Sequence, residues 1–256
     1  MSGSELASLN TVGDLTRLTL RRAPLNFLSL ELLQRIQELL ESVGDSPPGR
    51  VLIIDSDCAA FSAGLDMGDQ TREAVFLLLD QYHGIVRTLS TYPRPTIAIV
   101  RGVALGAGNE LAACCDFVLA SLQATFGQPE IKVGIMPSLA PLLLPHRIGM
   151  QRTLQMILTG NPVDAQEAER IGLIHRAVPE DALDTALEEL LSSFRSSSIA
   201  VMEMALRAAR GVRVRELESN LRDAESLYLN ELMDLDDPIE GIKAFLEKRS
   251  PQWKHR

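Results

Sequence analysis

The sequence has no apolar run that approaches the roughly 20 consecutive residues that a membrane-spanning helix needs. Its first residues, MSGSELASLN, lack both the apolar segment of a secretory signal and the arginine-rich amphipathic pattern of an organelle-targeting peptide. We therefore expect a soluble, cytoplasmic protein with no membrane partner.

Cysteine is scarce, and the three cysteines cannot all pair. Cys114 and Cys115 are neighbours in an apolar run, where small buried residues are expected rather than ligands or redox partners. There is no Cys-x-x-Cys or His-x-x-x-His spacing, so the sequence predicts no metal site.

Basic residues are outnumbered, 25 against 34 acidic ones, which leaves a formal charge of -9. This balance repels polyanionic backbones and argues against a nucleic-acid partner.

The chain of 256 residues, 46% of them hydrophobic, is long enough for one main domain with a smaller helical addition. Apolar spacing predicts strands over 15–22, 50–57, 97–105, 117–121 and 174–179. Helices are predicted between them, one of them over 72–92, and helices alone from Asp181 onwards. Ser29 is a candidate N-cap, and Pro145 is expected to interrupt a helix over 139–160. The alternation predicts βαβ units and a mostly parallel sheet.

The glycine-rich stretch VRGVALGAGNELAACCDFVLA (100–120) links a predicted strand to a predicted helix. Its glycines match neither phosphate-binding register, and no lysine follows them. The free N–H groups at such a helix start suit a developing oxyanion, although for this segment alone tight helix packing is the slightly favoured explanation of the small residues. A second loop of small residues, FSAGLD (61–66), favours a site with two donors.

Two carboxylates follow these loops. Glu110 opens the predicted helix, where it could simply stabilise the helix dipole, and Glu130 lies in a loop, where it could be a solvated charge.

Several ordered motifs, among them FSAGLD, RGVALGAGNELAACCD, FGQPEIKVGIMP and EGIKAFLEKRSPQW, resemble the crotonase (enoyl-CoA hydratase/isomerase) family over nearly the whole chain. The resemblance implies an α/β fold with a spiral core of ββα units over 1–195 and a C-terminal helical region over 196–256 for trimerisation. It also implies a homo-oligomer, a trimer or a dimer of trimers, and it replaces the simple picture of one doubly wound sheet.

The resemblance further assigns an oxyanion hole to the backbone N–H groups of Ala63 and Ala107, the latter at a position where the family usually has glycine. It assigns acid–base chemistry on water to Glu110 and Glu130, and contacts with the CoA adenine and 3'-phosphate to Phe245 and Lys248. The substrate is then an acyl-CoA thioester, and no cofactor is required beyond the CoA that belongs to it. Both glutamates together favour a hydratase.

After Glu130 the family's glycine-rich loop is replaced by GIMPSLAPLLLPHRIG, which makes this wall stiffer and more apolar. This loop and the C-terminal tail resemble the cyclic dienoyl-CoA hydratases of anaerobic aromatic degradation. The resemblance implies hydration of cyclohexa-1,5-diene-1-carbonyl-CoA to 6-hydroxycyclohex-1-ene-1-carbonyl-CoA.

Three alternatives remain: a straight-chain enoyl-CoA hydratase, a Δ3,Δ2-enoyl-CoA isomerase, and a non-catalytic binding protein with this fold. His83, His146 and His175 have no spacing that suggests a catalytic triad, and we expect structural or surface roles for them.

Overall fold

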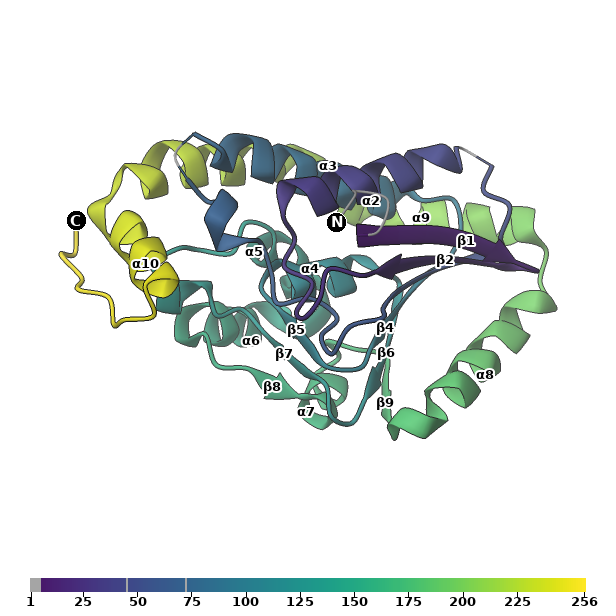
Figure 1. Cartoon of the computed structure of the whole chain (residues 1–256). Helices are drawn as coiled ribbons and strands as arrows, with labels where there is room; N and C mark the ends of the chain where they lie inside the picture. Colours follow the sequence, from purple (N-terminus) through teal and green to yellow (C-terminus); the bar gives the residue numbers. More distant parts are fainter. Residues whose placement is uncertain (1–5, 45, 72) are drawn as a thin grey trace.

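The computed structural model describes residues 6–44, 46–71 and 73–256, whose strands form two sheets (Figure 1). The larger sheet has the order β1 (Ala7–Val12), β2 (Leu15–Leu20), β3 (Val51–Ser56), β4 (Thr96–Val100), β6 (Phe117–Ser121) and β9 (Arg176–Val178). The smaller has the order β5 (Val103–Leu105), β7 (Thr125–Gly127) and β8 (Val163–Asp164). From β2 to β9 the larger sheet is parallel, which confirms the predicted parallel arrangement, and β1 pairs with β2 in antiparallel fashion.

Helices cover both faces of the larger sheet, so its strands alternate between two hydrophobic layers. In β3, Leu52 and Ile54 pack into the core that includes α2 (Leu30–Ser42) and α3 (Val75–Thr91). Val51 and Ile53 face the opposite way, against α8 (Leu183–Arg195). Figure 1 shows α2 and α3 above the sheet and α8 on the other side. The sheet is therefore a rigid support for the loops that leave its strands.

The remaining helices are α4 (Ala107–Cys114), α5 (Ala140–Leu143), α6 (Pro145–Thr159), α7 (Ala165–Arg170), α9 (Ile199–Ser226) and α10 (Asp236–Leu246). Short 3-10 turns cover Met67–Asp69, Glu130–Val133, Glu180–Ala182 and Leu232–Asp234, and a π-helical turn covers Leu227–Glu231. The chain beyond β9 is helical, as predicted, and α10 lies at the end of the molecule opposite α8 (Figure 1). The division at residue 195/196 stays a prediction.

Local chemistry explains several boundaries. Ser29 caps α2 by accepting a hydrogen bond from the Leu32 N–H, and Pro145 begins α6 directly after α5 has ended, so both predictions are confirmed. The predicted helix over 72–92 starts at Arg72, which lies outside the described residues, and α3 itself begins at Val75.

The predicted strand 97–105 is wrong in one respect, because it forms two strands, β4 and β5, in different sheets. Gly102 lies between them and packs so closely on the preceding loop that a Cβ there would be 1.9 Å from the Ala59 carbonyl oxygen. The chain therefore leaves the large sheet at this point, and the smaller sheet carries the turn into α4.

Candidate active site

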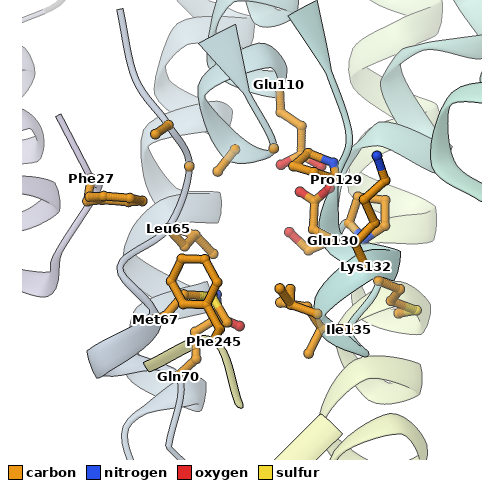
Figure 2. A pocket seen from close by; sticks show the side chains of 18 of the residues that line it. Phe27, Leu65, Met67, Gln70, Glu110, Pro129, Glu130, Lys132, Ile135 and Phe245 are labelled. Atoms are coloured by element: carbon orange, nitrogen blue, oxygen red, sulfur yellow. The ribbon is translucent and has the colours of Figure 1, made fainter. Parts of the chain in front are cut away.

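A cavity of about 280 Å³ opens where the loops after β3, β5 and β7 meet (Figure 2). Figure 2 shows Glu110 and Glu130 at one end of it, with Phe27, Leu65 and Met67 along the opposite wall. Most other lining side chains are apolar, among them Ile135, Met136 and Pro137. The two predicted carboxylates therefore share one largely apolar pocket.

The turn from β5 into α4 brings backbone N–H groups to this pocket. Gly106 adopts a φ of 53°, which favours glycine, and Ala107 begins the helix with an N–H that has no acceptor among the described residues. Gly108 allows close packing, since a Cβ there would lie 2.3 Å from the Ser62 carbonyl oxygen. The Tyr82 hydroxyl donates to the Ala107 carbonyl oxygen at 2.8 Å and holds the turn in place.

The loop after β3 lies directly against this turn, because a Cβ on Gly64 would be 3.6 Å from the Ala107 nitrogen. The Ala63 N–H, however, donates to the Leu25 carbonyl oxygen at 2.9 Å and is not available to a ligand. This bond corrects the prediction that Ala63 supplies the oxyanion donor. In the part of the chain that the structure describes, the Leu65 N–H has no acceptor, and Leu65 lines the cavity.

Glu110 is in the first turn of α4, and its side chain is only 1% exposed. Its Oε1 accepts two hydrogen bonds, from the Leu139 N–H at 2.9 Å and the Ala140 N–H at 2.7 Å. Burial raises the pKa of Glu110 to about 7, while these two N–H groups act in the opposite direction by stabilising the carboxylate. The side chain is held in one position, and its pKa lies near neutral pH.

Glu130 approaches from the loop after β7 and begins a 3-10 turn. Burial raises its pKa well above the ordinary value, and the negative charge of Glu110 raises it further. With its amide nitrogen turned toward Glu130, Gln128 donates to Oε1 at 3.0 Å and accepts from the Asn109 amide at 3.1 Å. Two backbone N–H groups favour the carboxylate form of Glu110, whereas burial and the neighbouring charge favour the protonated form of Glu130.

Of the two predicted CoA contacts, Phe245 on α10 lines the cavity and is 45% exposed (Figure 2). Lys248 follows α10 and does not line the cavity. Ala63, Ala107, Glu110, Glu130 and Phe245 are therefore brought together, and Lys248 is not.

Sequence reasoning missed a buried hydrogen-bonded chain beside the glutamates. His83 lies between Glu225, with 2.7 Å from Nδ1 to Oε1, and Ser138, with 3.1 Å from Nε2 to Oγ. His83 is fully buried, which agrees with the structural role expected for it, but its two hydrogen-bond partners were not predicted. The partners are 142 and 55 residues away along the chain, so no local spacing could have revealed them.

Within residues 6–44, 46–71 and 73–256, no three His, Cys, Asp or Glu side chains gather as they would around a metal ion. No helix in the described part of the chain is both long and apolar enough to cross a bilayer.

Comparisons with known proteins place the chain in a family. A sequence model of the enoyl-CoA hydratase/isomerase family matches residues 11–256. Over 244 residues the chain is 34% identical to the cyclohexa-1,5-dienecarbonyl-CoA hydratase of Thauera aromatica, covering 95% of this chain and 94% of that protein. It is 31% identical over 243 residues to a probable enoyl-CoA hydratase of Bacillus subtilis (strain 168), covering 93% and 94%.

Solved structures show the same architecture. The crystal structure of an enoyl-CoA hydratase from Mycobacterium avium subsp. paratuberculosis K-10 superposes with a TM-score of 0.86 at 25% identity, covering 97% of this chain and 98% of that one. An enoyl-CoA hydratase/isomerase from Xanthobacter autotrophicus Py2 gives 0.83 at 26% identity, covering 94% and 93%. The chain has the crotonase fold and belongs, as an enzyme, to the enoyl-CoA hydratase/isomerase family.

Proposed function

We propose that this enzyme adds water to a conjugated double bond of an acyl-CoA thioester, and that the acyl group is a cyclic diene. The observation that carries the proposal is the meeting of Glu110 and Glu130 in one apolar cavity, beside two backbone N–H groups with no acceptor among the described residues. No cofactor is needed beyond the CoA of the substrate.

The two N–H groups, of Leu65 and Ala107, form the oxyanion hole in this proposal. They bind the thioester carbonyl oxygen, on which negative charge develops as the conjugated system becomes an enolate. Such donors act on the transition state more than on the ground state, and one of them typically contributes about 10²- to 10³-fold in rate.

The glutamates take opposite roles because their surroundings differ. Glu110, stabilised as a carboxylate by two N–H groups, removes one proton from water while the water oxygen bonds to the electron-poor carbon. Glu130, which holds its proton more tightly, gives that proton to the carbon that carries the enolate charge. One water is consumed, and a proton moving from Glu110 back to Glu130 restores the starting state.

Two observations support a cyclic substrate. The relative from Thauera aromatica is named for a cyclic dienoyl thioester. The part of the cavity wall that follows Glu130 also consists mainly of apolar side chains, Ile135, Met136 and Pro137, and the cavity is compact, at about 280 Å³. A rigid ring loses less conformational entropy than a flexible chain when it is bound in a compact apolar cavity.

For the CoA portion, we expect the pantetheine arm to leave the cavity past Phe245 and the 3'-phosphate to meet Lys248 in a homo-oligomer, a trimer or a dimer of trimers. The proposal predicts one oligomeric species of three or six chains by light scattering.

A panel of thioesters in water labelled with both ¹⁸O and deuterium tests the proposal. Cyclohexa-1,5-diene-1-carbonyl-CoA and crotonyl-CoA are compared, and product mass and regiochemistry are recorded. We expect ¹⁸O incorporation with preference for the cyclic diene. Preference for crotonyl-CoA would contradict the cyclic substrate and indicate a straight-chain enoyl-CoA hydratase. Deuterium exchange at carbon without ¹⁸O incorporation would indicate an isomerase.

A further inference from the structure

The chain formed by Glu225, His83 and Ser138 runs from the surface of α9 to the wall of the cavity. The Glu225 side chain is 25% exposed, the His83 side chain is fully buried, and Ser138 is 5% exposed and lines the cavity. Three separate parts of the fold, α9, α3 and the loop before α5, supply these groups. The proposed roles of Glu110 and Glu130 do not involve these three residues, so their hydrogen-bonded arrangement requires its own explanation.

The chemistry of Glu225 decides which atoms donate and which accept in these hydrogen bonds. A Glu225 carboxylate only accepts, so the His83 proton is on Nδ1, 2.7 Å from the Glu225 Oε1. Burial lowers the pKa of His83 and keeps the ring neutral at pH 7, which leaves Nε2 as an acceptor. Arg87, whose Nη2 is 3.6 Å from the same Oε1, stabilises the carboxylate.

Ser138 must therefore donate its hydroxyl proton to the His83 Nε2 at 3.1 Å. Among the described residues, His83 is the only hydrogen-bond partner of the Ser138 Oγ. The remaining lone pairs of this oxygen are acceptors, and the donor they can take is a ligand in the cavity. The next two residues, Leu139 and Ala140, donate to Glu110, which places this acceptor beside the base.

Water that adds to a double bond brings two protons, and only one is removed. In the proposed reaction Glu110 takes that proton, while Glu130 carries a proton and cannot accept another. The second proton stays on oxygen as the hydroxyl of the product, and in an apolar cavity an unpaired hydroxyl proton is costly.

We infer that the Ser138 Oγ accepts this second hydrogen bond, first from the attacking water and then from the product hydroxyl, with His83 and Glu225 as positioning residues. The inference deepens the proposed hydration and rests on it for the role of the water. The ligand class is a hydroxyacyl-CoA thioester, distinguished from the same thioester without its hydroxyl.

The same order of residues, carboxylate, imidazole and serine, occurs where serine is a nucleophile. Here the two amides that follow Ser138 already donate to Glu110, so they do not form an oxyanion hole for an acyl-serine intermediate. Hydrogen bonding to the substrate is therefore the role that the geometry supports.

Binding of matched thioesters by isothermal titration calorimetry tests the inference. One pair is 6-hydroxycyclohex-1-ene-1-carbonyl-CoA and cyclohex-1-ene-1-carbonyl-CoA, and the other is 3-hydroxybutyryl-CoA and butyryl-CoA. Ser138→Ala is expected to weaken binding of a hydroxylated member by about 5- to 10-fold and to leave its partner within about twofold. Ser90→Ala, a change at another buried serine outside the cavity, should alter neither.

Two further variants address the positioning residues. His83→Leu and Glu225→Ala should each reduce the same preference for the hydroxylated thioester, and neither should add to the effect of Ser138→Ala. If His83→Leu does not fold, as judged by circular dichroism, Ser138→Ala and Glu225→Ala, at a partly exposed residue, still test the inference. Equal weakening of both members of each pair, or no change, overturns the inference.

Mass spectrometry after incubation with each thioester examines the nucleophile alternative. We expect an unchanged protein mass, and an acyl adduct on Ser138 would overturn the binding role. If the parental enzyme hydrates no thioester in the panel, the proposed function fails. The preference of the parental enzyme and of Ser138→Ala for hydroxylated ligands still decides the role of Ser138.

Discussion

Glu130 lies so close above Gly106 that a Cβ at Gly106 would be 2.6 Å from the Glu130 Oε1. The same glycine has a φ of 53°, so its lack of a side chain serves both the backbone and the position of the carboxylate.

Gly106→Ala should therefore affect catalysis and stability together. The added methyl group would push the Glu130 carboxylate out of position, which is expected to lower kcat by about 10²-fold. The strained backbone should lower the free energy of unfolding by about 1–3 kcal/mol. Gly13→Ala is the matched control, because Gly13 has a φ of 60° and nothing within 4 Å of an added Cβ. It should lose stability and keep kcat, and equal kcat losses in both variants would contradict the role of the Gly106 contact.

Replacement of either carboxylate should remove most of the turnover. We expect Glu110→Gln and Glu130→Gln each to lower kcat by about 10²- to 10⁴-fold, because each loses one proton-transfer step. Steady-state kinetics with the best thioester of the panel measures this, and CoA binding by calorimetry checks that the site persists. Glu38→Gln, on the exposed surface of α2, is the control. Parental turnover in either active-site variant would exclude the two-carboxylate mechanism.

The raised pKa of Glu110 predicts how stability depends on pH. Its folded-state pKa of about 7 is above the ordinary value of 4.5, so between these values the folded protein holds a proton that the unfolded chain has released. The contribution of Glu110 to stability is therefore greatest below pH 4.5 and falls as the pH rises toward 7. In Glu110→Gln this fall should be weaker, measured as the free energy of unfolding in urea from pH 4.5 to 8. An unchanged slope would contradict the raised pKa.

Backbone substitution distinguishes the two amides of the loop after β3. Replacing residue 65 by the α-hydroxy acid of leucine removes its N–H and should lower kcat by about 10²- to 10³-fold. The same change at Ala63 removes the donor to the Leu25 carbonyl oxygen and should cost about 1 kcal/mol of stability with little loss of kcat. The reverse pattern would restore Ala63 as the oxyanion donor.

At the mouth of the cavity, Phe245→Ala should raise KM for CoA thioesters by about tenfold with kcat nearly unchanged, because an aromatic contact with the ligand is lost. Phe76→Ala, at a phenylalanine on α3 that is 65% exposed and does not line the cavity, should leave KM unchanged. Lys248→Ala should raise KM at low ionic strength and less at high salt, as expected for a contact with phosphate. If its effect does not depend on salt, Lys248 does not contact the phosphate.

The parts of the fold that local patterns specify were predictable. The Ser29 cap, the start of α6 at Pro145 and the apolar strands β3 and β6 all follow from residues that are near one another in the sequence. The strands β7 and β8 have three and two residues, too few for a hydrophobic period, and they were missed.

The residues of the site could be predicted from motifs, but the hydrogen bonds between them could not. Both glutamates follow from the resemblance, but the motif FSAGLD does not show which of its N–H groups is free. That depends on Leu25, which takes the Ala63 N–H from another part of the chain. The link between His83 and Ser138 also depends on contacts between distant segments, and only the folded chain brings these residues together.

The hydrogen bonds from Leu139 and Ala140 to Glu110 have a consequence for protein engineering. In the proposed reaction, the loop beside the acyl site is therefore also the loop that stabilises the carboxylate of the base. A library that varies residues 138–141 to accept new substrates would shift the pH optimum of each member along with its selectivity. Screening such a library at a single pH would therefore discard active variants, and selection should sample several pH values.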